Sequence, residues 1–168
     1  SFCGIVGMRP TPGRVASDND GILDQTLGVQ GPMARTVEDL ALLFDAMSGE
    51  DRRDLLSKPK PAQSFLSAAR AGWLPRKVAY SPNLGITPVD PEIAEITRKA
   101  ALRFAEAGVI VEEATPDLSG AHECFGVLRA RNFATSKGPL LDEHRDKFKP
   151  DLIWNIEAGL KLTADQIA

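Results

Sequence analysis

Residues 77–114 read KVAYSPNLGITPVDPEIAEITRKAALRFAEAGVIVEEA, the pattern of a strand, a helix and a second strand. Val78-Ala79-Tyr80 is typical of a strand. Asp90-Pro91-Glu92 predicts a helix start, because it combines an N-cap, a proline at the first helical position and an acidic side chain. We expect the helix to run to about Ala107, to end at the next glycine in a left-handed cap, and to lead into a buried strand at Val109-Ile110-Val111.

This unit determines the predicted fold class. Four apolar residues recur along one face of its helix: Ile93, Ile96, Ala100 and Phe104. A strand, a crossover helix and a second strand pair in parallel with a right-handed connection, and the helix lies on one face of the sheet. The chain is therefore expected to be α/β, with a βαβ crossover at 77–114.

Upstream, Thr36 is expected to cap a helix that runs to about Met47 and ends at Gly49, with Asp39 at the capping-box position. The apolar residues at helical spacing are Val37, Leu40, Ala41, Phe44 and Met47. Residues 50–62 contain Lys58-Pro59-Lys60-Pro61 and predict a surface loop. A short helix is expected over 64–71, closed by a glycine.

Downstream of Ser119 the pattern is mostly helical, so 119–168 is expected to be a helical region. The expected helices are 121–136, 140–148 and 151–158, with breaks at Gly138-Pro139, Pro150 and Gly159. Thr163-Ala164-Asp165-Gln166 is a capping box, which predicts one more helix start.

The N-terminal third contains the most specific motifs. Residues 1–15 read SFCGIVGMRPTPGRV, in which Pro12-Gly13 fits the two central positions of a type II turn. The second block, residues 29–54, reads VQGPMARTVEDLALLFDAMSGEDRRD. The order and spacing of these two blocks resemble the amidase signature family of Ser-Ser-Lys amide hydrolases, over about a third of the chain. The matching elements are Phe2-Cys3-Gly4, Gly7, Arg9-Pro10-Thr11, Gly13-Arg14-Val15, Gly31-Pro32, Arg35-Thr36-Val37, Asp39 and the turn at 49–54.

The resemblance implies a mixed β-sheet core covered by helices, and a parent enzyme that hydrolyses a carboxamide through a serine acyl-enzyme. It also implies that the catalytic set lies upstream of this sequence, because the family's nucleophilic serine comes a few residues before the Phe-Cys-Gly run. Ser1 matches a structural position after the nucleophile. We therefore predict that the chain contains no catalytic residue and that it is inactive by itself.

The sequence opens on an apolar strand and closes soon after the last capping box, which leads us to expect a single truncated domain over 1–168. Its signature-derived part is 1–54. If the strands at Ile5-Val6, 78–80 and 109–111 belong to one larger sheet, an apolar face or an unpaired edge is exposed. We therefore expect self-association through the surface around 2–8.

Composition limits the partners. The chain has 168 residues, 43% of them hydrophobic, a net charge of −3 and a pI near 5.4. Its basic residues are scattered, so nucleic acid is not an expected direct partner. No apolar run reaches the length of a membrane span, so no membrane association is expected. Two cysteines do not make a disulfide framework, which favours the cytoplasm.

Other chemistry has weak support in the sequence, and no cofactor or metal is expected. His122 and Cys124 could be metal ligands, but with Cys3 and His144 they lack the spacing of a zinc site. Cys124 with His122 or His144 could also mimic a nucleophile and base, but no local feature predicts a lowered thiol pKa, so a small buried thiol is expected. Ser81-Pro82-Asn83-Leu84-Gly85 lacks the spacing of a phosphate loop and predicts a turn.

Two further groups of residues have a favoured structural role. Arg14 and Arg35 could tie loop carbonyls or a carboxylate together. In the family, the region after the crossover contributes to the acyl pocket, which Phe125, Leu128 and Phe133 could line, but a core role is favoured for these three.

Two alternatives to a stand-alone amidase stay open. The first is the glutaminase-type subunit of a glutamyl-tRNA(Gln) amidotransferase, although such subunits carry a Ser-Leu-Asp type run before Gly-Pro where this chain has Thr26-Leu27-Gly28-Val29-Gln30. The second is a non-enzymatic βαβ interaction module. A stand-alone amidase acting on a small-molecule amide is favoured.

Overall fold

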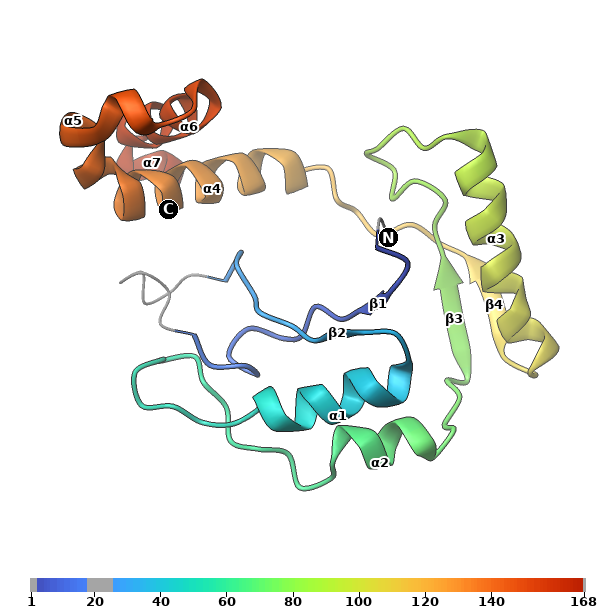
Figure 1. Ribbon diagram of the computed structural model, residues 1–168. Coiled ribbons are helices and arrows are strands. Elements are labelled where there is room, and N and C mark those ends of the chain that lie inside the picture. Colours follow the sequence, from blue (N-terminus) through green and yellow to red (C-terminus); the bar gives the residue numbers. More distant parts are fainter. Residues whose placement is uncertain (1–2, 18–25, 168) are drawn as a thin grey trace. The chain divides into compact units, whose positions relative to one another are not determined.

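A computed structural model of the chain describes residues 3–17 and 26–167 (Figure 1). The chain divides into two compact units, one made of Ser1–Gly72 with Cys124–Ala168 and the other of Trp73–Glu123. Ser1 and Phe2, which belong to the N-terminal motif, lie outside the described residues. The assignment of 1–168 to a single truncated domain stays a prediction.

The first unit begins with a small antiparallel sheet. Strand β1 (Val6–Gly7) pairs with β2 (Met33–Ala34) in the register Val6↔Ala34 and Gly7↔Met33. Helix α1 (Val37–Met47) follows directly, and α2 (Phe65–Arg70) packs against it. The Phe44 and Phe65 rings stack with their centroids 4.1 Å apart, and Phe44 is 2% exposed, so this helix pair supplies a local core.

The predicted start of α1 is confirmed. The Thr36 hydroxyl accepts a hydrogen bond from the backbone N–H of Asp39 at 3.1 Å, as an N-cap side chain does. Leu40, Ala41 and Phe44 are buried as expected. Val37 is 57% exposed, so its assignment to the buried face is wrong. Val37 is the first residue of the helix, where no preceding turn can cover it.

The two helices are also joined by a side chain. The Asp45 carboxylate accepts hydrogen bonds from the backbone N–H groups of Phe65 and Leu66, at 2.7 and 3.1 Å. Desolvation raises the pKa of this carboxyl, but the bonds from Leu66 and Phe65, with smaller contributions from Lys60 and Ser64, together outweigh it, and the pKa lies below its usual value. An anion at a helix N-terminus satisfies N–H groups that have no partner within the helix.

The second unit is the predicted βαβ crossover. Strands β3 (Lys77–Tyr80) and β4 (Ile110–Glu113) pair in parallel, with Lys77 opposite Ile110 and Tyr80 opposite Glu113, and α3 (Pro91–Glu106) connects them. The cap geometry also follows the prediction. The Asp90 carboxylate accepts from the N–H of Glu92 at 2.8 Å, and Gly108 has φ +83°.

Burial within this unit differs from the expectation. Val109 is buried at 6% exposure, but Ile110 in β4 is 53% exposed. The predicted apolar face of α3 is open as well, with Ile93 at 51%, Ile96 at 55% and Phe104 at 40% exposure. Two strands and one helix are too few to cover each other on all sides. The predictions of a fully buried second strand and of a buried apolar face on α3 are therefore wrong for this structure. Within the described residues, the strands form two separate two-stranded sheets.

The chain after residue 120 is helical, as predicted. It contains α4 (Ala121–Lys137), the 3-10 helix η1 (Gly138–Leu140), α5 (Leu141–His144), the 3-10 helix η2 (Arg145–Lys147), α6 (Pro150–Leu160) and α7 (Ala164–Ile167). The predicted capping box is present, because Thr163 N–H donates to the Gln166 side chain at 2.9 Å and Gln166 N–H donates to the Thr163 hydroxyl at 3.3 Å. Within the described part of the chain, no helix is long and apolar enough to cross a membrane.

Gly159 was predicted to break a helix, and this prediction is wrong. It lies inside α6, where an added Cβ would be 2.0 Å from the carbonyl oxygen of Ala130 and 2.7 Å from the Cβ of Ala134. The glycine therefore allows α6 to approach α4 closely.

We predict that Gly159→Ala lowers the free energy of unfolding by about 1–3 kcal/mol, because the new methyl group overpacks this helix crossing. Gly126→Ala in α4 is the matched control, since its Cβ would meet no atom within 4 Å. It should leave stability unchanged or raise it by about 0.5–1 kcal/mol through helix propensity. Equal melting temperatures for the two variants would contradict the close crossing.

We also predict that the 168-residue chain self-associates through the exposed apolar side chains of the β1–β2 region. Val6, Met8 and Met33 are 38%, 43% and 65% exposed. Sedimentation velocity over a range of concentrations should show species larger than a monomer, and Met33→Gln should shift the distribution toward the monomer. A monodisperse monomer at every concentration would contradict this prediction.

Candidate functional site

The candidate site is the set of loops in which the N-terminal motifs meet. Its centre is the turn at Thr11-Pro12-Gly13-Arg14, closed by a 3.0 Å hydrogen bond from Arg14 N–H to the Thr11 carbonyl. Gly13 has φ +78°, which confirms the predicted type II turn. An added Cβ at Gly13 would be 1.7 Å from the Leu56 carbonyl oxygen. The position therefore requires glycine for its backbone conformation and for the close approach of another loop.

The 54–59 loop is held against this turn by two hydrogen bonds. Lys58 N–H donates to the Gly13 carbonyl at 2.9 Å. The Arg14 guanidinium donates to the Pro59 carbonyl at 2.9 Å. Arg14 thus has the structural role that was favoured for it, tying a loop carbonyl to the turn.

Asp54 fixes the inner side of the same loop. Asp54 is buried, with 8% of its surface exposed. One carboxylate oxygen accepts from the backbone N–H of Ser17 at 3.0 Å, and the other accepts from the N–H of Leu56 at 2.8 Å. A buried carboxylate must be hydrogen-bonded, and here both oxygens bond to main-chain groups of two separate segments.

Beside Asp54, the Asp51 carboxylate is held by Arg53. The guanidinium donates to both carboxylate oxygens, at 3.0 and 2.8 Å, and the Arg53 N–H donates at 2.9 Å. The side-chain hydrogen bond from Arg53, followed by the backbone one, keeps the pKa of Asp51 far below its usual value. Asp51 therefore stays ionised and is not suited to act as a general acid or base near neutral pH.

A small cavity lies at this junction. It has a volume of about 40 Å³ and is lined by Ala16, Ser17, Asp51, Arg53 and Asp54. Ligand pockets have volumes of about 300–1,000 Å³. This cavity is therefore large enough for water and too small for an amide substrate.

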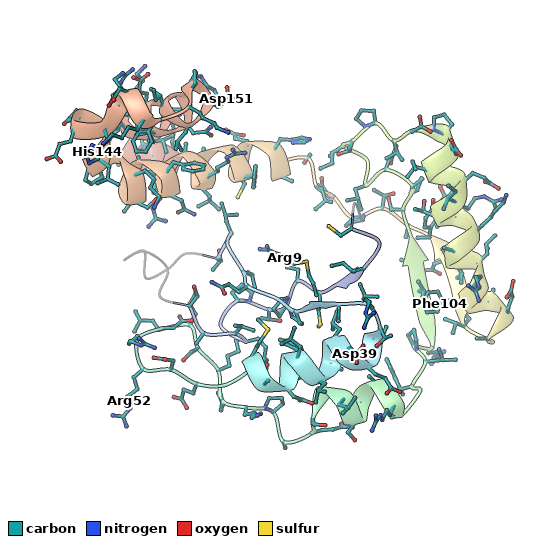
Figure 2. All side chains as sticks on the ribbon, viewed as in Figure 1. Arg9, Asp39, Arg52, Phe104, His144 and Asp151 are labelled. Atoms are coloured by element: carbon teal, nitrogen blue, oxygen red, sulfur yellow. The ribbon has the colours of Figure 1, made fainter. Side chains whose placement is uncertain are left out.

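The Gly31-Pro32 motif packs on the other side of the Arg9-Pro10-Thr11 motif. Met8 N–H donates to the Pro32 carbonyl at 3.1 Å, and an added Cβ at Gly31 would be 2.0 Å from the Met8 carbonyl oxygen. The Arg9 guanidinium (Figure 2) donates to the carbonyl oxygens of Leu27 and Thr26, at 2.9 and 3.3 Å. Arg9 thus holds the segment before Gly31 through main-chain carbonyls. This contact does not need the aspartate that amidotransferase subunits carry before Gly-Pro.

The motif residues therefore share one type of interaction. The side chains of Arg9, Arg14 and Asp54 each bond to the main chain of a segment distant in sequence. Such an arrangement positions loops and does not by itself break a bond. That the chain contains no catalytic residue remains our prediction.

The cysteine and histidine candidates gain no support. Cys3 and Cys124 are both exposed, so the prediction of a buried thiol at Cys124 is wrong. His122 Nε2 lies 3.4 Å from the Ile86 carbonyl oxygen. Among residues 3–17 and 26–167, no three histidine, cysteine, aspartate or glutamate side chains are placed to hold a metal ion. The predicted turn after β3 is confirmed, since Gly85 has φ +74° and its N–H donates to the Asn83 side chain.

The aromatic residues of α4 are less buried than a core role requires. Phe125 is 51% exposed, so its assignment to the core is wrong, and Leu128 and Phe133 are half-buried. Arg129 lies between the two aromatic rings, and sequence reasoning missed it. The signal was the spacing Phe125, Arg129, Phe133, which places all three side chains on one side of a helix.

The larger apolar groove is in the second unit. It has a volume of about 510 Å³ and is lined by Leu74, Ala100, Arg103, Phe104, Glu106 and Ala107. This lining contains one cation and one anion but no serine, threonine, cysteine or lysine. The groove is therefore not a candidate for the chemistry of amide hydrolysis.

This chain is similar to known proteins of the Amidase family. The family model described as Amidase matches residues 1–136. An acylamidase from Rhodococcus erythropolis is 36% identical over 131 residues, which cover 73% of this chain and 26% of the relative. The A-type subunit of the glutamyl-tRNA(Gln) amidotransferase from Moorella thermoacetica is 34% identical over 113 residues, which cover 67% of this chain and 23% of that protein.

The fold comparison agrees with the sequence comparison. The crystal structure of a bacterial aryl acylamidase of the amidase signature family matches with a TM-score of 0.77 and 27% identity, over 98% of this chain and 36% of that chain. The α/β fold class is thereby confirmed. The chain spans about a quarter of the length of the two curated relatives described above.

We predict that Gly13→Val destabilises the protein by more than about 2 kcal/mol, because a β-branched residue is strained at positive φ and its Cβ would collide with the Leu56 carbonyl. Gly49→Ala is the matched control, since nothing lies within 4 Å of its Cβ. Thermal unfolding of both variants measures the difference. An unchanged melting temperature in Gly13→Val would contradict both the positive φ of Gly13 and its close contact with the Leu56 carbonyl.

Proposed function

The chain belongs to the Amidase family, and from that premise we propose that the protein containing it hydrolyses a small-molecule carboxamide to a carboxylate and ammonia or an amine. The observation that supports this most strongly is the family match over residues 1–136. Within that range, Gly13 and Gly31 each sit where any side chain would collide with the backbone of another loop. These two motif glycines therefore have a structural role, because they allow the loops to pack closely.

The proposed reaction is acyl transfer through serine. A serine hydroxyl attacks the amide carbonyl, the C–N bond breaks, and the nitrogen leaves with a proton as ammonia or an amine. Water then attacks the acyl-serine ester and releases the carboxylate. This chemistry needs no cofactor. We propose that the nucleophile, the bridging serine and the lysine base lie outside these 168 residues, and that this chain holds the loops that surround them.

The main alternative is the glutaminase-type subunit of a glutamyl-tRNA(Gln) amidotransferase, which is supported by relatives such as the one from Moorella thermoacetica. The absent aspartate before Gly31 favours the stand-alone amidase. Family membership favours an enzyme over a non-enzymatic βαβ module. A cytoplasmic location, and the absence of direct nucleic-acid or membrane partners, remain predictions.

We predict that the 168-residue chain alone releases no ammonia or amine from simple amides and is not labelled by a fluorophosphonate probe. The full-length protein should hydrolyse simple amides, and the probe should label one serine upstream of Ser1. Mass spectrometry of the labelled peptide identifies the site.

Two outcomes would overturn the proposal in different ways. Labelling of a serine within 1–168, with turnover by the chain alone, would show that the catalytic set has been misplaced. Release of ammonia from glutamine only in the presence of partner proteins and charged tRNA would favour the amidotransferase.

A further inference from the structure

One side of α4 carries a cation between two aromatic rings. The guanidinium carbon of Arg129 is 5.9 Å from the centroid of the Phe125 ring and 5.4 Å from that of the Phe133 ring. The three residues are spaced four apart, so they form one stripe along the helix. We call Phe125, Arg129 and Phe133 the aromatic–arginine stripe.

The guanidinium of Arg129 is held in place but not neutralised. Within residues 3–17 and 26–167, it has no hydrogen bond and no ion pair with another side chain or with the main chain. Other arginines are paired: Arg9 and Arg14 bond to carbonyls, and Arg70, Arg98 and Arg145 form ion pairs with glutamates. Arg129 is exposed, so its N–H donors remain accessible to a ligand beside the two rings.

Phe125 and Arg129 of the stripe lie away from the surface by which α4 packs. Ala130 is 8% exposed, and its carbonyl lies where a Cβ at Gly159 would collide with it. Phe125, by contrast, remains 51% exposed. The helix packing against α6 thus does not account for Phe125 beside Arg129, while Phe133 at the other end of the stripe is half-buried.

We propose that the aromatic–arginine stripe binds an aromatic ring that carries a carboxylate. The planar guanidinium can donate two parallel hydrogen bonds to a carboxylate, and the two phenylalanine rings can contact the ligand's ring edge-to-face or in an offset stack. The unpaired positive charge selects an anion, and the rings beside it select an aryl group over an alkyl chain or inorganic phosphate. This inference rests on the proposed function and specifies its substrate class: amides that contain a benzoate group.

The first test compares two amides with the same scissile bond in the full-length protein. These are 4-acetamidobenzoate, which carries the carboxylate, and acetanilide, which does not. The ratio of their kcat/KM values should fall about three- to fivefold in Arg129→Ala, with the loss in KM, as expected for removal of a charge-assisted hydrogen bond on an exposed surface. Arg129→Lys keeps the positive charge but cannot donate two parallel hydrogen bonds to a carboxylate. Its kcat/KM ratio should therefore lie between those of the wild type and Arg129→Ala.

The matched control is Arg52→Ala, which removes an exposed arginine that points into solvent (Figure 2). It should leave the ratio unchanged. A lower melting temperature in Arg129→Ala with the same substrate ratio as the wild type would show that the stripe only stabilises α4, and would overturn the proposal.

The second test separates this proposal from the proposed function. If the wild-type protein hydrolyses neither amide, the proposed function fails, but benzoate itself can still be titrated by calorimetry. Saturable benzoate binding that is weakened in Arg129→Ala and in Phe125→Ala, but not in Arg52→Ala, would support the stripe as a site. Benzoate binding that is absent in the wild type, or equal in all four proteins, would overturn it.

Discussion

The close approach of the Leu56 carbonyl to Gly13 is the constraint on which the N-terminal part of the structure depends. A Cβ at this position would be 1.7 Å from that oxygen, so the two loops can meet only where a residue has no side chain. The contact brings Lys58 N–H to the Gly13 carbonyl and Pro59 to the Arg14 guanidinium. The same principle recurs at Gly31 and at Gly159, each of which receives a carbonyl oxygen from a distant segment.

The charged residues of the motifs complement these glycines. Arg9, Arg14 and Asp54 each bond to main-chain groups 17 to 45 residues away in sequence. Bonds to charged groups are stronger than neutral ones, and loops without secondary structure need partners for their buried main-chain groups. In this structure the Gly, Pro, Arg and Asp residues of the signature therefore fix the positions of loops relative to one another.

Local features of the fold could be predicted from the sequence, and long-range ones could not. The caps at Thr36, Asp90 and Thr163 bond to residues two or three positions away, so their sequence patterns contain the whole interaction. The role of Gly159 depends on Ala130, and no pattern near Gly159 shows it. The burial of Phe125 could not be predicted for a related reason, since it depends on which face of α4 packs against another element, and Phe125 lies on an exposed face. At the candidate site, the turn at Gly13 was predicted but its partner loop was not.

The loops that carry the signature form one hydrogen-bonded scaffold, and amide hydrogen exchange at single residues tests this directly. Lys58, Leu56 and Ser17 lie outside helices and strands, yet their N–H groups donate to the Gly13 carbonyl and the two oxygens of Asp54. We expect these three amides to exchange much more slowly than the nearby loop amide of Arg52. Exchange of all of them at the rate of an unstructured peptide would contradict it.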